Sequence, residues 1–442
     1  MSQDGLPLEA FEAFVAEQLR LGQTPGLALS VQRGDALWQR GYGYADLERR
    51  VPMTERSGVV IGSTTKALTC VALLQLAERG ALSLDDPITR YIPSFHLASV
   101  PEPAITIRQA VTHAAGLPPT RSDDPTFLCC DDAADDALAR YVDTLAERTP
   151  IWPPGAGWAY ANDGYTLAGR VIEVATGLAY EDYMRRYVLA PLALQETGFG
   201  REDLPDAAIA TPYDYDGDGA PYPSFFPRNR ASAAAGSQLI MSARDAGRWL
   251  QTALHAGEAP GGRLLSAERF AELFRPQVPL PAGVRGSDGT DRQYALGWML
   301  GSLAGMPAIH HGGSAITMGS HFVLVPEEQL AVAVVTNSST QATAIIAEGI
   351  VSLALGRQPV RGFPAVDPAF VPDRTRWPEL VGVYQPLITQ NSVPGPLPIV
   401  YEDERLRART YPGDAQRRPG DIFMRPVGDL RFVLSGRGRT GS

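Results

Sequence analysis

The chain has 442 residues, of which 44% are hydrophobic and 20% charged, and its net charge is −10. This composition fits a globular protein of two or three domains with a substantial core. The acidic balance argues against nucleic acid or an anionic membrane surface as the main partner. No apolar run approaches the roughly 18–20 residues that span a bilayer.

Two features favour a cytoplasmic location. Residues 1–5 lack the basic and apolar segments of a secretory signal, although a trimmed secreted chain would look the same. The cysteines are Cys70, Cys129 and Cys130. Because their number is odd and two are adjacent, we expect reduced, structural thiols and no disulfide framework.

The first part of the chain predicts one helix and three strands. Apolar residues recur at helical spacing over 8–21, and strands are expected over 26–31 and 36–44. A short buried strand over 59–61 runs directly into Ser63.

Lys66 is the only lysine of the chain, since the other 38 of the 39 basic residues are arginines. Arginine stays protonated and cannot take a proton from a nucleophile, whereas a lysine whose pKa is lowered by burial can. Ser63 lies three residues before Lys66. Because S-x-x-K alone is a weak motif, a surface lysine that escaped replacement is the alternative interpretation.

The residues after Lys66 favour the chemical interpretation. Residues 67–77 are apolar on nearly every face, and Gly80 follows where a helix would end. A helix that is apolar all round is buried. Ser63 and Lys66 would then share one face of its first turn, where the positive end of the helix dipole favours an oxyanion and disfavours a second cation.

The middle of the chain is mainly helical and interrupted by Pro-rich loops. The expected helices cover residues 108–113, 131–148, 164–175, 181–188, 242–254 and 267–274.

One loop in this region resembles a calcium-binding segment. Asp214, Asp216 and Asp218 alternate, but the twelfth position of an EF-hand, which must be Glu, would be Phe225. We therefore expect an acidic surface loop, with a calcium site of another kind as the alternative.

The pattern changes to strands near residue 294. Strands are expected over 294–303, 309–314, 321–325 and 330–336, with a helix over 342–355. Prolines then mark a linker over 359–376, and a small β-rich domain is expected over 377–442.

Tyr160 and Asn162 are two apart in a segment that reads as extended, so both side chains point to one side. A tyrosine there can relay a proton to a leaving group if a nearby cation lowers its pKa. Taken alone, Tyr160 would more simply be an aromatic packing residue.

His311, Gly312, Gly313 and Ser314 form a second notable run. Two glycines in a strand indicate close approach of another backbone or of a ligand, and a backbone N–H just after them could complete an oxyanion hole with that of Ser63. His311 could hold a substrate carboxylate or support Tyr160. A metal site is disfavoured, because His310 and His311 would point to opposite faces and no third ligand is evident.

Together these residues resemble the serine β-lactamase and penicillin-binding-protein superfamily, within it the class C β-lactamase, D-D-carboxypeptidase and esterase branch. That branch carries S-x-x-K, Y-x-N and K-T-G or H-x-G motifs, which appear here in order and at similar spacing at Ser63, Tyr160 and His311. The segments 105–117 and 297–298 also match. No G-x-S-x-G elbow surrounds Ser63, which disfavours a Ser-His-Asp hydrolase.

The resemblance implies an α+β fold. An antiparallel sheet flanked by helices and a mostly helical region, about 90–290, would form a hydrolase domain over 1–358. The domain after the linker looks lipocalin-like but is short, as an incomplete or divergent copy of that domain would be.

The resemblance also implies roles. Ser63 would be acylated. Lys66, jointly with Tyr160, would take the proton of Ser63, and Tyr160 would also pass a proton to the leaving group. The N–H groups of Ser63 and Ser314 would form the oxyanion hole. The substrate would be bound by Asn162, His311, Gly312 and Gly313. How Lys66 and Tyr160 divide the base role stays open.

The expected activity is hydrolysis of an ester or amide through an acyl-enzyme, with no metal or cofactor. Histidine in place of lysine at position 311 ranks an esterase or D-amino-acid amidase or peptidase ahead of a β-lactamase, and an acyltransferase last. A penicillin-binding or sensing protein with little turnover is the alternative. The partner would be a small molecule or a peptide, and the sequence does not indicate an oligomeric state.

Overall fold

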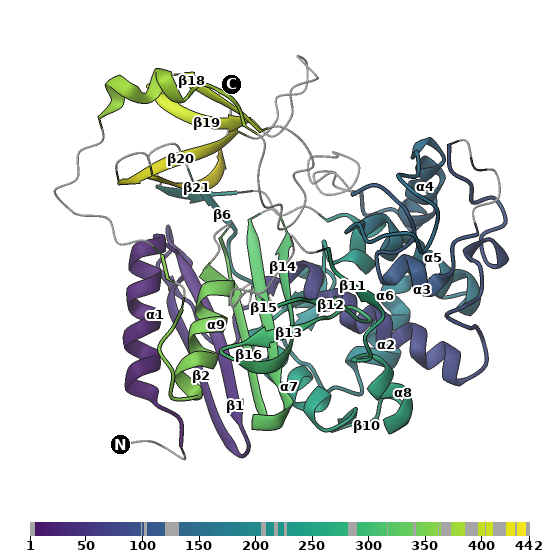
Figure 1. Ribbon diagram of the computed structural model, residues 1–442. Helices are drawn as coiled ribbons and strands as arrows, with labels where there is room; N and C mark the ends of the chain where they lie inside the picture. The colour runs from purple at the N-terminus through teal and green to yellow at the C-terminus, as the bar shows by residue number, and fades with distance from the viewer. Residues whose placement is uncertain are drawn as a thin grey trace.

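The computed structural model describes residues 5–98, 100, 104–119, 132–204, 209–215, 220–224, 228–281, 290–315, 317–338, 342–360, 362–363, 373–384, 397–402, 404–409, 421–428 and 431–438. Figure 1 shows a central sheet, a helical region beside it, and a small β-sheet near the C-terminus. The predicted α+β class is confirmed.

The central sheet pairs strands from the start of the chain with strands from residues 278–336. Its antiparallel strands follow the order β11, β12, β13, β14, β15, β16, β1, β2, β3. Pairing of β1 with β16, from Leu27 opposite Thr336 to Arg33 opposite Leu330, places N-terminal strands beside strands some 300 residues later. The bounds are Val278–Pro279, Gln293–Tyr294, Met299–Leu303, Met306–Ala315, Met318–Val325, Leu330–Thr336, Gly26–Arg33, Ala36–Asp46 and Val51–Pro52 in that order.

Helices cover both faces of this sheet, so its central strands are buried on both sides (Figure 1). α1 (Leu8–Gly22) and α9 (Ala342–Ala354) pack on one face against alternate residues of β1, β15 and β16. α7 (Ala243–Leu254) packs on the other face against the intervening residues. Near-continuous apolar runs in β15 and β16 are what a strand buried on both faces requires.

The helical region supplies most of the larger core. It contains α2 (Thr65–Glu78), α3 (Ile107–Val111), α4 (Ala137–Thr144), α5 (Asn162–Thr176), α6 (Tyr180–Met184) and α8 (Ala267–Glu272). No helix among the described residues is long and apolar enough to cross a membrane.

Two predicted elements are wrong in extent. The strand predicted over 294–303 is broken, because Gly297 takes φ +77° and a Cβ there would lie 2.6 Å from the backbone of Ala67. β12 therefore ends at Tyr294 and β13 begins at Met299. The helix predicted over 131–148 is shorter within its described part, since a carboxylate oxygen of Asp132 accepts the N–H of Ala134 and competes with helix formation.

The C-terminal part forms a five-stranded antiparallel sheet in chain order, as the prediction of a small all-β region requires. Its strands are β17 (Gly382–Tyr384), β18 (Leu397–Glu402), β19 (Arg405–Arg409), β20 (Asp421–Gly428) and β21 (Arg431–Gly438). Trp377, Ile399 and Leu406 form a core of their own. β21 lies against β6 (Tyr213–Tyr215) of the larger region (Figure 1).

Candidate active site

Ser63 and Lys66 lie where a short strand of a separate three-stranded sheet leads into the buried helix α2. β4 (Val59–Val60) pairs with β8 (Ile240–Met241) and leads through the 3₁₀ turn η1 (Gly62–Thr64) into α2. α2 is buried on every side over its first twelve residues, as its apolar sequence predicts. Ser63 is partly exposed, whereas Lys66 is 0% exposed.

Three oxygen atoms surround the Lys66 amine. Its Nζ lies 2.9 Å from Ser63 Oγ, 2.7 Å from Asn162 Oδ1 and 2.6 Å from the carbonyl oxygen of Ala235. No carboxylate pairs with Lys66 among the described residues. Burial therefore lowers the pKa of this amine well below its ordinary value.

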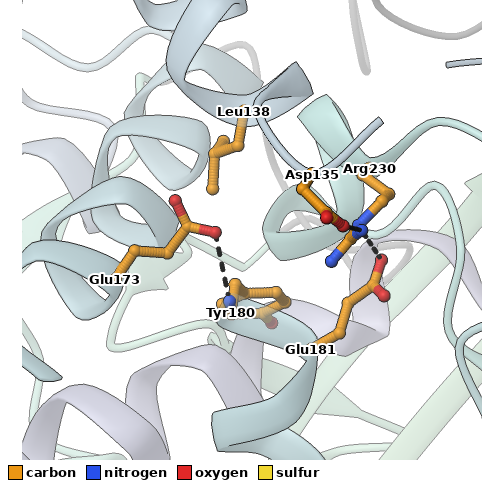
Figure 2. Close-up of a pocket in the computed structure, with 6 residues that line it drawn as sticks. All are labelled: Asp135, Leu138, Glu173, Tyr180, Glu181 and Arg230. Atoms are coloured by element: carbon orange, nitrogen blue, oxygen red, sulfur yellow. Dashed lines mark hydrogen bonds and ion pairs between the residues drawn. The ribbon is translucent and has the colours of Figure 1, made fainter. Parts of the chain in front are cut away.

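The carbonyl of Ala235 belongs to η7 (Arg230–Ala235), a short 3₁₀ helix of small residues. η7 is held at both ends. At its start, Arg230 forms ion pairs with Asp135 and Glu181 beside the small pocket in Figure 2. At its end, Thr69 Oγ1 donates to the carbonyl of Ala234 at 2.9 Å, next to the bond from Lys66.

Figure 2 also shows that this pocket contains none of the predicted site residues. Its lining consists of Asp135, Leu138, Glu173, Tyr180, Glu181 and Arg230. The pocket lies at the start of η7. Ser63 lies at the other end of that helix, where a Cβ on Gly236 would lie 2.9 Å from the Ser63 nitrogen.

Tyr160 and Asn162 both reach the Ser63–Lys66 pair. Asn162 is the first residue of α5, so the segment predicted as extended ends one residue earlier, at Ala161. An interaction with the Ser63 side chain favours the ionised Tyr160 hydroxyl, and the Lys66 Nζ lies 5.1 Å from the centre of the Tyr160 ring. Burial raises the pKa of Tyr160, and the interaction with Ser63 offsets this only in part, so the pKa is not lowered by the nearby amine.

Strand β14 packs directly against η1. A Cβ on Gly313 would lie 1.8 Å from the carbonyl oxygen of Ile61, and one on Gly62 would lie 2.4 Å from the nitrogen of Ser314. Only glycines permit this approach, as the paired glycines predicted. The backbone nitrogens of Ser63 and Ser314 thus come from two segments in contact.

His311 is 2% exposed and lies behind this backbone. Its Nδ1 is 2.6 Å from the carbonyl oxygen of Gly312, and its Nε2 is 3.1 Å from the hydroxyl of Tyr294. Its ring is near that of Tyr160, with 6.2 Å between centroids. Burial and the nearby Lys66 lower the pKa of His311 to about 3. Both ring nitrogens are occupied, which weighs against the expectation that His311 holds a substrate carboxylate.

The remaining candidates carry no site chemistry in the described chain. Cys70 is a free, buried thiol beside the Tyr165 hydroxyl, and burial raises its pKa to about 12. Asp214 is buried in β6, so this end of the predicted surface loop is a strand, while residues 216–219, 129 and 130 lie outside the described residues. No group of three His, Cys, Asp or Glu side chains suited to a metal occurs among the described residues.

Sequence reasoning missed three partners of the site: the carbonyl of Ala235, His113 and Tyr294. A carbonyl has no sequence signature beyond the run of small residues around it, which permits close approach. Tyr294 was assigned to a continuous strand, and the turn at Gly297 that sets its position follows from packing against α2.

The chain is similar to known proteins over most of its length. A family model described as beta-lactamase matches residues 11–354. Penicillin-binding protein 4 of Amycolatopsis lactamdurans is 27% identical over 368 residues, which cover 81% of this chain and 93% of the relative. Penicillin-binding protein 4* of Bacillus subtilis is 30% identical over 178 residues, or 40% of this chain and 38% of the relative.

A solved structure shares the fold almost throughout. The octameric penicillin-binding protein homologue from Pyrococcus abyssi has a TM-score of 0.71 and 23% identity, with 99% of this chain and 95% of that chain covered. At this identity the likeness concerns the fold alone.

Proposed function

Because this chain belongs to the beta-lactamase family, we propose that it is a serine hydrolase that forms an acyl-enzyme on Ser63. One observation carries the proposal: the hydrogen-bond partners of Lys66. A neutral amine has two N–H donors and one lone pair. Asn162 Oδ1 and the carbonyl of Ala235 can only accept, so they take the two donors, and the lone pair faces the hydroxyl of Ser63.

The mechanism follows from that arrangement. Ser63 Oγ attacks the substrate carbonyl carbon while its proton passes to Lys66. The oxyanion that forms is stabilised by the N–H groups of Ser63 and Ser314. The leaving group takes a proton from the Tyr160 hydroxyl, which Lys66 replenishes. Water then attacks the acyl-enzyme and gives up a proton, which Lys66 and Tyr160 pass to the departing oxygen of Ser63.

The raised pKa of Tyr160 supports an assignment of the base role, which the sequence left open between Lys66 and Tyr160. A tyrosine that stays neutral cannot act as an anionic base but still carries a proton for the leaving group, so the neutral amine of Lys66 is then the base. Asn162 both orients Lys66 and contributes its amide to substrate binding.

Within this class we rank hydrolysis of esters or D-amino-acid amides first, ahead of β-lactam hydrolysis and acyl transfer. His311 replaces the lysine of dedicated class C β-lactamases and has no free nitrogen for a ligand. The second candidate is a penicillin-binding protein with little turnover, and the names of the two relatives favour it.

Intact-protein mass spectrometry tests both. The protein is incubated with an activated small ester and, separately, with a penicillin, and Ser63→Ala is the control. A transient adduct with turnover of the ester, absent from Ser63→Ala, is the expected result. A lasting penicillin adduct without turnover of either reagent would support the second candidate, and no adduct with either would overturn the acyl-enzyme.

A further inference from the structure

A chain of four hydrogen bonds connects the helical region to strand β14. The N–H of Ala161 lies 3.1 Å from His113 Nδ1, and His113 Nε2 lies 3.1 Å from the Tyr294 hydroxyl. That hydroxyl lies 3.1 Å from His311 Nε2, and His311 Nδ1 lies 2.6 Å from the carbonyl oxygen of Gly312. The chain therefore starts one residue after Tyr160 and ends in the strand that carries Ser314.

The two ends of the chain fix the direction of every bond. A backbone N–H only donates, so His113 Nδ1 accepts and the His113 proton is on Nε2. A carbonyl only accepts, so His311 donates from Nδ1 and its Nε2 accepts. Tyr294, which also interacts with Tyr165, then accepts from His113 and donates to His311. A second proton on His311 would present Tyr294 with N–H donors from both sides.

The surroundings also disfavour a charged His311. His113, Tyr294 and His311 are 1%, 0% and 2% exposed. The titratable groups that face His311 from the packed elements bring no negative charge among the described residues; they are Lys66, His113, Tyr160, Tyr294, His310 and His321. Burial, the largest cause of the lowered pKa of His311, acts against an imidazolium.

The leaving group of a substrate would lie near this neutral imidazole. Tyr160, the proton relay of the proposed mechanism, has its ring 6.2 Å from that of His311. A carboxylate on the leaving group would lose water there beside the neutral His311 imidazole and a neutral Lys66 amine that already has three partners. An uncharged leaving group does not have this cost.

We propose that the hydrogen-bond chain through His113, Tyr294 and His311 occupies both nitrogens of His311. It thereby limits the substrates to esters and amides without a carboxylate on the leaving group. The inference rests on the proposed hydrolase function and narrows it. Tyr294 and His113 act as positioning residues, since they reach the substrate only through His311. Peptides with a free C-terminal carboxylate and penicillins are then poor substrates.

A matched pair of esters tests the substrate class on the unmodified protein. 3-Carbamoylphenyl butanoate and 3-carboxyphenyl butanoate differ in one charge at nearly equal size. Each kcat/KM is divided by the spontaneous hydrolysis rate of the same ester. We expect the carbamoyl ester to be preferred by about tenfold or more, a value that corresponds to about 1.4 kcal/mol. An equal or higher value for the carboxyl ester overturns the inference, whereas no acylation by either ester overturns the proposed function instead.

Tyr294→Phe tests the role of the hydrogen-bond chain. Without the hydroxyl, His311 Nε2 loses its donor and becomes free to protonate as the pH falls. The ratio of carboxyl-ester to carbamoyl-ester kcat/KM should then rise as the pH falls from 8 to 5.5, because a bound carboxylate stabilises a proton on Nε2 against the effect of burial. Tyr183→Phe is the control, because it removes another buried hydroxyl, which bonds Gln75 Oε1 at 3.2 Å. A flat ratio in folded, active Tyr294→Phe would contradict the assigned role, and the ester pair tests the substrate class even if this variant does not fold.

Discussion

A Cβ atom on Gly62 would lie 2.4 Å from the backbone nitrogen of Ser314. The residue before the proposed nucleophile and the residue after the glycine pair of β14 are therefore in direct backbone contact. Gly62 also takes φ +62°, a conformation that side chains disfavour. This contact brings the N–H groups of Ser63 and Ser314 together, so Gly62 is as important to the proposed oxyanion hole as either donor.

Gly62→Ala should therefore lose activity, and Gly80→Ala is its matched control. Gly80 takes φ +71°, but a Cβ there meets nothing within 4 Å. Both substitutions should cost about 1–2 kcal/mol of stability from the left-handed backbone. Only Gly62→Ala should also lower kcat, by about 10²–10³-fold, as expected when an oxyanion-hole donor is displaced. Equal activity in the two variants would mean that the contact is structural only.

Lys66→Arg tests the assignment of the base. The variant keeps a long nitrogen-bearing side chain, but arginine stays protonated and cannot accept the Ser63 proton. We expect the acylation rate to fall by about 10²–10⁴-fold, which is the usual contribution of a general base. Stopped-flow release of 4-nitrophenol measures the acylation rate, and Ser63→Ala gives the background rate. Retention of most of the acylation rate would show that another group takes the proton.

Much of this site follows from residue types and their spacing. The lone lysine three residues after Ser63, the apolar helix after it and the glycine pair after His311 each predicted a contact that the structure contains. These features are local, or are forced by close backbone approach, so they leave a signature in the sequence.

The partners that were missed depend on contacts distant in the chain. Ala235 meets Lys66 across 169 positions, and His113 meets Tyr294 across 181 positions. Nothing at either residue specifies its partner. The raised pKa of Tyr160 was likewise not predictable, because burial outweighs the nearby amine only in the folded chain.

Tyr160→Phe should have an effect that depends on the leaving group. A neutral tyrosine supplies a proton, and 4-nitrophenoxide leaves readily without one, whereas an alkoxide does not. We expect a loss of less than about fivefold with a 4-nitrophenyl ester and about 10²-fold or more with the ethyl ester of the same acid. A comparison of kcat/KM for the two esters measures the difference. Equal losses would assign Tyr160 to activation of Ser63 rather than to the leaving group.

Three buried histidines should make the fold sensitive to acid. The pKa values of His113, His310 and His311 are lowered by burial, to about 3 for His311. Below the unfolded pKa of about 6.5, the unfolded chain binds protons that the folded chain does not, so stability falls with pH from there toward the folded pKa values. The combined slope can reach about 4 kcal/mol per pH unit. Urea unfolding between pH 8 and pH 4.5 measures it.

His310→Leu isolates one of these contributions. His310 is 2% exposed, and neither ring nitrogen has a hydrogen-bond partner among the described residues. Leucine removes both the two ring nitrogens that lack hydrogen-bond partners and the group that binds a proton. The variant should be stabilised more at pH 5 than at pH 8, and its slope should be smaller by about one proton. His96→Leu, at an exposed position, controls for the loss of an imidazole. An unchanged slope in His310→Leu would mean that His310 is not the group that resists protonation.

The last prediction concerns where the hydrolase domain ends. The sequence placed the boundary at residue 358, but Phe363 packs on α1: its N–H donates to Gln18 Oε1 at 2.7 Å, and its ring lies against Gly22. A chain ending at residue 363 should therefore fold and hydrolyse esters, whereas one ending at residue 358 should be less stable by about 1 kcal/mol, since Phe363 is partly buried and full burial of a phenylalanine contributes about 1.5–3 kcal/mol. Phe363→Ala in the full chain should show a similar loss by urea unfolding. If the chain ending at 363 does not fold, the contact of β21 with β6 is essential, and the C-terminal sheet belongs to the same folding unit.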